Sequence, residues 1–152
     1  MSRIYVGTCN WSDHANFYPD GLPANQRITY YARRFPIVEI DSTYYRLMPA
    51  RNFALWAERT PDDFVFDVKA FRQLTFHDRE TPPGGMVHAQ FSGSVQPLRD
   101  ARKLGALHFQ FPPWYVFSER NLAYLESLRG LYPEDALSVE FASKFDTVVS
   151  FE

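Results

Sequence analysis

The sequence predicts an α/β protein of the TIM-type (β/α) barrel class that holds about the first five βα units of an incomplete barrel. Strand-like runs alternate with segments of helical periodicity, which implies parallel strands joined by helical crossovers. Four of these strands carry polar residues on one face, where a barrel lines its interior. The 152 residues are fewer than the roughly 200–250 of a complete barrel. We therefore expect the C-terminal βα units to be absent.

The first two units show clear boundaries. Ile4–Thr8 is a short β-prone run, and residues 23–34 have apolar side chains at helical spacing. Pro36 ends this helix, because proline cannot continue the backbone hydrogen bonding of a helix. Ile37–Asp41 is the second strand, and a further helix is expected to begin near Pro49.

The third and fourth units follow the same order. Phe64–Ala70 is the third strand, and a helix is expected over Ser94–Lys103. Pro97 should then lie near the first turn of that helix, where its missing N–H costs nothing. Ala106–Phe111 is the fourth strand, which a Pro-Pro pair ends.

The fifth unit is the last that the sequence indicates. Ser118 is a plausible N-cap, with Asn121 three residues later, and Gly130 should close the helix that follows. Leu137–Phe141 is the fifth strand. The alternation has no linker, internal repeat or low-complexity segment, so residues 1–152 are expected to form one partial barrel domain.

Polar residues occupy alternate positions in the second to fifth strands. Because strand side chains alternate between faces, the two members of each pair point the same way. Buried charges persist only where they pair, bind a cation or reach water, and Lys69 is expected to pair with Asp67, Glu39 or Glu140. A half-exposed antiparallel sheet and a purely structural salt-bridge core are the alternatives. The pairs are Glu39 and Asp41, Asp67 and Lys69, His108 and Gln110, and Ser138 and Glu140.

Composition excludes several classes of function. A net charge of −2 lacks the basic footprint of a nucleic-acid-binding protein. No N-terminal apolar leader and no run of about 18 apolar residues is present, so no membrane association is expected and the cytoplasm is the default location. The single Cys9 excludes an internal disulfide. Solvent-exposed positions are expected for His14, His88 and the basic clusters Arg33–Arg34 and Arg99/Arg102/Lys103.

Several motifs, in this order along nearly the whole chain, resemble the domain of unknown function 72 family (YecE-like). The resemblance implies a TIM-type barrel with a polar cavity at the carboxyl ends of its strands, in a family without an established reaction. The motifs are Gly7-Thr8-Cys9-Asn10-Trp11, Glu39-Ile40-Asp41-Ser42-Thr43-Tyr44-Tyr45, Gln110-Phe111-Pro112-Pro113 and Val139-Glu140-Phe141. Position by position, the resemblance assigns to the cavity Thr8, Trp11, Glu39, Ser42, Tyr44, Lys69, Gln110 and Glu140.

The candidate site combines this set with the polar strand pattern and an aromatic rim. Glu39, Lys69 and Glu140 are the candidate catalytic residues, because carboxylates serve as general acid and base and a lysine holds anions or forms a Schiff base. The chemistry would be that of a hydrolase or an isomerase/lyase. No cofactor is predicted; a divalent metal at Glu39, Asp41, His108 and Glu140 is an alternative without a local motif. The candidate ligand-binding residues are Thr8, Trp11, Ser42, Tyr44, His108, Gln110 and Trp114.

Three functions of different classes are left open. The first is an enzyme acting on a small polar, phosphorylated or sugar-like ligand. The second is a non-catalytic binding or interaction domain that uses an aromatic rim. The third is an inactive truncated fragment, or a part that needs a second chain, with self-association through unclosed barrel edges. The expected partner is a small molecule. The rim is formed by Trp11, Tyr44, Tyr45, Trp114 and Tyr115.

Overall fold

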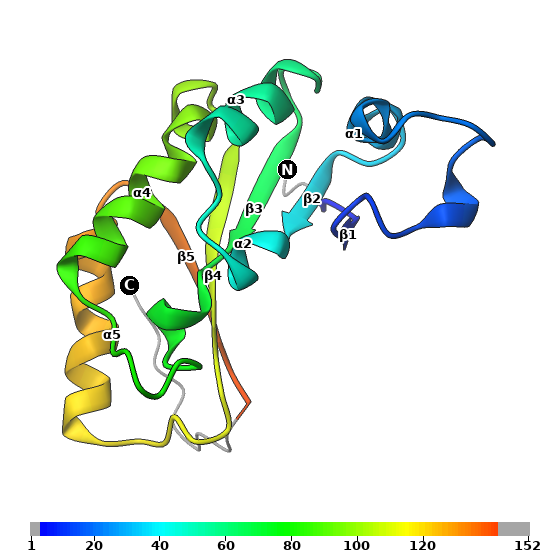
Figure 1. Ribbon diagram of the computed structural model, residues 1–152. Helices are drawn as coiled ribbons and strands as arrows, with labels where there is room; N and C mark the ends of the chain where they lie inside the picture. Colours follow the sequence, from blue (N-terminus) through cyan, green and yellow to red (C-terminus); the bar gives the residue numbers. More distant parts are fainter. Residues whose placement is uncertain (1–3, 143–152) are drawn as a thin grey trace.

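A computed structural model describes residues 4–142 as one five-stranded parallel sheet with helices between the strands (Figure 1). The strands lie side by side in the order in which they occur in the chain. All four neighbouring pairs are parallel, so the predicted α/β class and the crossover topology are confirmed, and the antiparallel alternative is wrong. The strands are β1 (Gly7–Cys9), β2 (Ile37–Ile40), β3 (Val65–Lys69), β4 (Leu104–Phe111) and β5 (Ala136–Phe141).

Helices connect every pair of neighbouring strands. Three short 3₁₀ segments, η1 (Ala15–Phe17), η2 (Ala24–Gln26) and η3 (Arg72–Thr75), complete the connections. The α-helices are α1 (Arg27–Ala32), α2 (Ser42–Tyr45), α3 (Ala50–Glu58), α4 (Gly85–Asp100) and α5 (Glu119–Leu131). No helix within residues 4–142 is long and apolar enough to cross a bilayer.

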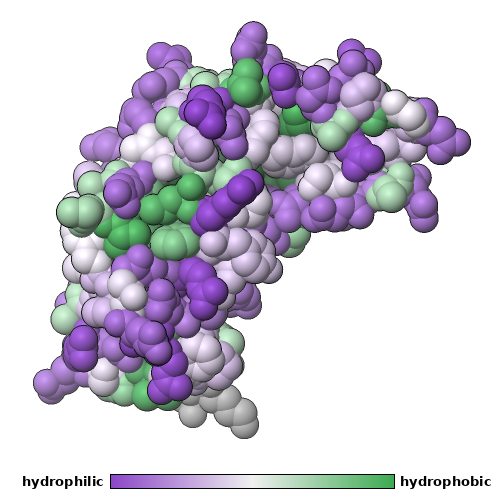
Figure 2. Space-filling view, viewed as in Figure 1, coloured by the Kyte–Doolittle hydropathy of each residue, from purple (hydrophilic) through white to green (hydrophobic). Residues whose placement is uncertain are grey.

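The sheet curves, and the longer helices lie on its convex side (Figure 1). The space-filling view has the outline of a crescent, with hydrophilic residues over much of the visible surface (Figure 2). In the described part of the chain β1 and β5 remain the two edges of an open sheet. The structure therefore shows a curved parallel sheet without showing a closed barrel.

The hydrophobic core lies between the convex face of the sheet and the helices. Strand residues such as Val68, Leu107 and Phe109 are fully buried there. Helix residues that recur at helical spacing, among them Phe53 on α3 and Phe91 on α4, belong to the same core cluster. Because the fully buried apolar residues of β2 to β4 point to this side, the polar residues that alternate with them lie on the concave face.

A β-bulge shapes the centre of the sheet between β3 and β4. Phe66 pairs with Leu104 but Val68 pairs with Leu107, so β4 carries one extra residue at this point. Asp67 Oδ1 accepts a hydrogen bond of 2.8 Å from the Ala106 N–H. That bond satisfies a backbone donor in the irregular segment, and it holds the Asp67 carboxylate against the polar face.

Most predicted elements agree with the structure to within a few residues. The α5 N-cap is confirmed, since the Ser118 hydroxyl accepts a hydrogen bond of 3.1 Å from the Asn121 N–H. The helix predicted to begin near Pro49 starts at Ala50. The predicted start of the first strand at Ile4 is wrong: pairing begins at Gly7, opposite the first residue of β2.

The predicted start of the fourth-unit helix is also wrong. Helix α4 begins at Gly85 rather than Ser94, because Val87, Phe91 and Val95 already face the core at helical spacing. Pro97 consequently lies near the end of the helix, where one backbone hydrogen bond is lost.

Three basic residues expected in solvent are tied into the fold. The Lys103 ammonium is buried and donates to the carbonyl oxygens of Ala57 (2.6 Å) and Thr60 (2.8 Å), at the end of α3. Arg99 makes a bidentate ion pair with Asp135, with N–O distances of 2.8 and 2.7 Å. His88 is 5% exposed. These side chains fix helices to the sheet, and sequence spacing alone does not distinguish such roles from solvation.

Candidate functional site

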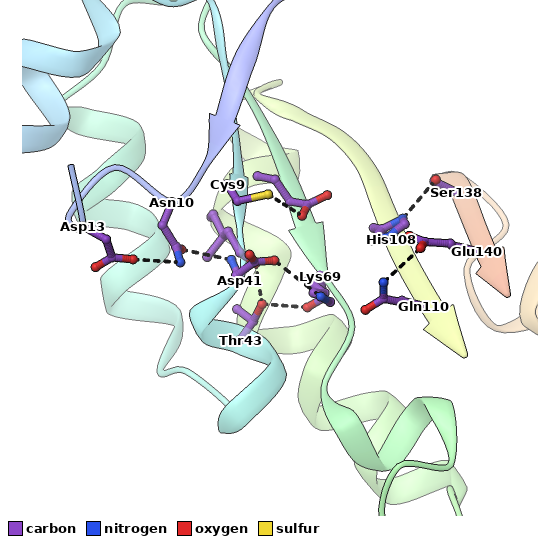
Figure 3. A network of polar contacts seen from close by, with 12 residues as sticks. Cys9, Asn10, Asp13, Asp41, Thr43, Lys69, His108, Gln110, Ser138 and Glu140 are labelled. Carbon is purple, nitrogen blue, oxygen red and sulfur yellow. Dashed lines mark hydrogen bonds and ion pairs between the residues drawn. The ribbon is translucent and has the colours of Figure 1, made fainter. Parts of the chain in front are cut away.

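The concave face of the sheet gathers polar side chains from all five strands. The strand register places Cys9, Glu39 and Asp67 in one row across β1 to β3. A second row across β3 to β5 contains Lys69, His108 and Ser138, and Gln110 pairs with Glu140 beyond it. Figure 3 shows that the labelled polar residues form two groups, one at β1 to β3 and the other at β4 and β5.

The first group contains a thiol, two carboxylates and an ammonium. The Cys9 thiol donates to Glu39 Oε1 over 3.5 Å. Lys69 Nζ lies 3.8 Å from Asp41 Oδ1, so Lys69 pairs with Asp41 rather than with the three carboxylates predicted from the sequence. Asn10 Oδ1 accepts a hydrogen bond of 3.1 Å from the Asp41 N–H, which holds the end of β2 against the loop after β1.

The second group centres on His108. Its Nε2 lies 3.3 Å from Glu140 Oε2, and its Nδ1 lies 3.0 Å from Ser138 Oγ. A carboxylate only accepts hydrogen bonds, so Nε2 carries the proton, and a neutral ring accepts from Ser138 at Nδ1. Gln110 Nε2 donates to Glu140 Oε1 over 3.0 Å. The Glu140 carboxylate is therefore oriented by two neighbours while its side chain stays 53% exposed.

Burial and like charges alter the acidities of the first group. Burial, followed by a hydrogen bond and repulsion from Asp41, raises the pKa of Glu39 above its ordinary value. Burial and the same two carboxylates raise the pKa of the Cys9 thiol to about 11. Burial also raises the pKa of Asp67, against the opposing effect of the Ala106 N–H. Glu39 is thus suited to hold a proton, and Cys9 stays a thiol at neutral pH.

One set of side chains on this face has donor atoms close enough to share a cation. Single ligand atoms of Cys9, Glu39 and Asp41 all lie within 4.8 Å of one another. Of the alternative metal set considered from the sequence, Glu39 and Asp41 belong to this group, whereas His108 and Glu140 contact each other in the second group.

Three predicted ligand-binding residues lie away from the concave polar cluster. Thr8 points to the helix side, where its hydroxyl lies 2.9 Å from the Tyr31 hydroxyl and donates to the Asn10 carbonyl over 2.8 Å. Trp11 packs edge-on against Trp56, with ring centroids 5.0 Å apart. Trp11 and Ser42 line a separate hollow of about 330 Å³ beside the cluster.

The aromatic rim is only partly as predicted. Tyr44 lies beside Lys69, whose Nζ is 5.4 Å from the ring centroid, and Trp114 is 46% exposed at the end of β4. Tyr115 is wrong as a rim residue, because it is 2% exposed and stacks on Phe111 in the core. His77, which follows η3, contacts the rings of Tyr44 and Trp114.

The predicted catalytic residues Glu39, Lys69 and Glu140 all lie on the concave face, with His108 and Gln110 among them. The sequence prediction named Asp41 only in an alternative metal set and left out Asp67 as a site residue, although both belong to its alternating pattern. Cys9 had no such signal, because its position depends on the pairing of the short β1 with β2.

Comparisons with known proteins identify the family. Residues 5–144 match the family described as protein of unknown function DUF72. The chain belongs to the DUF72 family. Among curated relatives, the UPF0759 protein YunF of Bacillus subtilis (strain 168) is 34% identical over 144 residues, which is 93% of this chain and 51% of YunF. The UPF0759 protein YecE of Escherichia coli (strain K12) is 30% identical over 131 residues, covering 84% of this chain and 45% of YecE.

Solved DUF72 structures share the fold of the chain. A DUF72 family protein from Thermotoga maritima MSB8 superposes with a TM-score of 0.75 at 35% identity, covering 90% of this chain and 55% of that one. A DUF72 family protein from Enterococcus faecalis V583 gives a TM-score of 0.81 at 24% identity, with coverage of 91% and 50%. The chain therefore spans about half the length of the DUF72 proteins it matches.

Proposed function

We propose that the five βα units are the first part of a TIM-type barrel, and that the protein is an enzyme acting on a small polar, phosphorylated or sugar-like ligand. The topology supports the barrel, because the strands follow the chain order and the core helices pack on one face of the sheet. A doubly wound sheet would reverse its strand order and carry helices on both faces. In a TIM-type barrel the concave face is the interior, and ligands bind at the carboxyl ends of the strands.

The observation that carries the enzyme proposal is that Glu39, Lys69 and Glu140 share one concave face with His108 and Gln110. A stabilising salt-bridge core would pair its charges fully. Here Glu39 has a raised pKa, and the Glu140 side chain remains 53% exposed although two neighbours orient it. Perturbed acidity in a polar, solvent-accessible cluster is typical of catalytic groups.

The residues suggest a division of roles. Glu39, whose pKa burial and Asp41 raise, is the better proton donor of the two carboxyl groups and acts as the general acid. Glu140, oriented by His108 and Gln110, acts as the general base or nucleophile. The Lys69 ammonium stabilises negative charge that develops on the ligand. This combination serves a hydrolase or an isomerase/lyase that moves a proton at a hydroxyl or carbonyl carbon.

Turnover by the full chain tests this proposal. The chain is incubated with a panel of sugars, sugar phosphates and small hydroxy acids, and product is followed by proton NMR. Glu39→Gln and Glu140→Gln should each lower kcat by about 10²-fold or more, while the exposed α5 residue in the control Glu126→Gln should leave it unchanged. Variants that unfold like the parent yet retain full turnover would overturn the proposal, as would a panel without any product.

A non-catalytic binding domain is the second candidate. It is favoured by the ring contacts among Tyr44, His77 and Trp114 at the edge of the concave face. This function predicts saturable binding without product. In that case Glu39→Gln and Glu140→Gln would change the affinity for the ligand, and neither the parent nor the variants would form product.

A further inference from the structure

Four rings form a continuous row at the carboxyl ends of β2, β3 and β4. We call Tyr45, Tyr44, His77 and Trp114 the ring row. The centroids of Tyr45 and Tyr44 are 5.1 Å apart, those of Tyr44 and His77 5.0 Å, and those of His77 and Trp114 6.0 Å. Each contact is edge-to-face, and the two end rings are exposed, Tyr45 at 74% and Trp114 at 46%.

Hydrogen bonds hold the middle and the end of the ring row in place. Trp114 Nε1 donates to the Phe76 carbonyl over 2.9 Å. His77 Nδ1 lies 2.9 Å from the hydroxyl of the buried Thr75. Phe76, between them, has a left-handed backbone conformation with φ of 58°. The rings are therefore preorganised, which lowers the entropy cost of stacking a ligand on them.

Basic side chains accompany the ring row. Lys69 Nζ lies 5.4 Å from the Tyr44 centroid, and the Arg79 guanidinium carbon lies 5.5 Å from that of Trp114. Burial lowers the pKa of His77, and the positive charges of Arg72 and Lys69 lower it further. Both basic side chains therefore lie near the His77 ring. Asp78 and Glu80 flank Arg79 in the chain. Within residues 4–142, however, Arg72 and Arg79 have no carboxylate partner at ion-pair distance.

The remainder of the concave face carries the opposite charge. Carboxylates dominate the neighbouring group of Cys9, Glu39, Asp41 and Asp67, which would repel an anion. The two ends of the site thus differ in chemistry. One end offers rings and cations, and the other offers acids and hydrogen-bond partners.

We propose that the ring row binds the flat, phosphate-bearing end of the ligand and so orients its other end toward Glu39 and Glu140. The orientation of the ligand toward Glu39 and Glu140 rests on the proposed function. The binding of its phosphate-bearing end depends only on the ring row and the basic side chains beside it. Stacking suits a planar ring, and guanidinium groups match phosphate oxygens in a bidentate manner. The guanidinium group has no comparable partner on a neutral, fully hydroxylated sugar.

Phenyl phosphate is a suitable probe, with phenol and inorganic phosphate as its two halves. The three tryptophans of the ¹⁵N-labelled full chain are followed by their indole N–H signals, and Trp114→Phe assigns the signal of interest. We expect phenyl phosphate to shift the Trp114 signal and to leave those of Trp11 and Trp56 in place. Each half-probe should bind at least tenfold more weakly.

Arg79→Gln should weaken phenyl phosphate binding about tenfold or more, because it removes a charge-assisted hydrogen bond to the phosphate. The matched control Arg120→Gln, exposed on α5, should bind as the parent does. Unchanged affinity in Arg79→Gln, or equal shifts of all three indoles, would overturn the inference. Glu39→Gln should keep the shift of the Trp114 indole signal, because Glu39 is not part of the ring row. If the parent protein binds phenyl phosphate in an Arg79-dependent manner but shows no turnover in any assay, the proposed enzyme is refuted and the ring-row site is retained.

Discussion

At the level of single residues, the buried histidine His88 joins two tyrosine hydroxyls across the core. Its Nδ1 lies 2.8 Å from the Tyr132 hydroxyl and its Nε2 3.3 Å from the Tyr124 hydroxyl. Tyr124 already donates to the Leu74 carbonyl over 2.6 Å. His88 therefore donates from Nε2 to Tyr124 and accepts at Nδ1 from Tyr132, which makes the neutral ring the one that satisfies all partners.

This neutral ring makes stability depend on pH. Burial lowers the pKa of His88 to about 4, against about 6.5 in an unfolded chain. The unfolded state thus binds more protons between these values, so the His88 contribution is complete above pH 6.5 and is lost as the pH falls toward 4. We expect the free energy of unfolding to fall by about 2 kcal/mol between pH 7 and pH 5 because His88 is protonated in the unfolded state. Urea unfolding at each pH measures this change. His88→Gln should flatten that pH dependence, and a parent whose unfolding free energy stays constant over this range would contradict the assignment.

At the level of elements, the bulge in β4 connects the core to the polar face. Gly105 sits where the extra residue of β4 lies, and a Cβ there would meet Asp67 Oδ1 and come within 2.6 Å of Val65 Cγ1. A side chain at this position would displace the carboxylate from the Ala106 N–H. The bulge and the placement of Asp67 on the concave face are therefore one structural feature.

Gly105→Ala should lower the free energy of unfolding by about 1–3 kcal/mol, as overpacking does. It should also weaken any ligand binding that depends on the concave face. The matched control is Gly93→Ala in α4, where nothing lies within 4 Å of the added Cβ. That control should stabilise the protein by up to about 1 kcal/mol, because alanine is the better helix former. Equal effects of the two substitutions on chemical denaturation would contradict the role of the bulge.

At the level of the whole molecule, one core cluster spans all the long helices and the convex face of the sheet. Trp56 packs on Phe53 in α3, and Trp114 lies in the loop after β4. Because the core is continuous, the protein should unfold cooperatively, so that the surroundings of Trp56 and of Trp114 lose structure together.

We expect far-ultraviolet circular dichroism and tryptophan fluorescence to report the same thermal transition. An inactive fragment without stable structure would instead give broad transitions that do not coincide. Repeating the melt at several protein concentrations separates self-association from folding, because an association through the open sheet edges raises the midpoint with concentration.

The strand pattern predicted much of the fold because local signals and tertiary packing agreed there. The parallel order and the shared face of Glu39, Lys69, His108 and Glu140 follow from period-2 alternation between helices. Prediction failed where packing overrode local chemistry. The start of α4 after a Pro- and Gly-rich loop, the burial of Lys103 and the burial of Tyr115 against Phe76 each depend on a partner far away in the chain.

The sequence by itself determined the α/β class, the parallel direction of the strands and the residues that share the polar face, since these depend on periodicities within short segments and on the helices between strands. Only the tertiary structure decided which of those residues meet. The pairing of Lys69 with Asp41, of His108 with Glu140, and of His77 with Trp114 arises from strand register and loop conformation. Such contacts join elements 28 to 37 residues apart, and a local pattern carries no information about how distant segments are aligned.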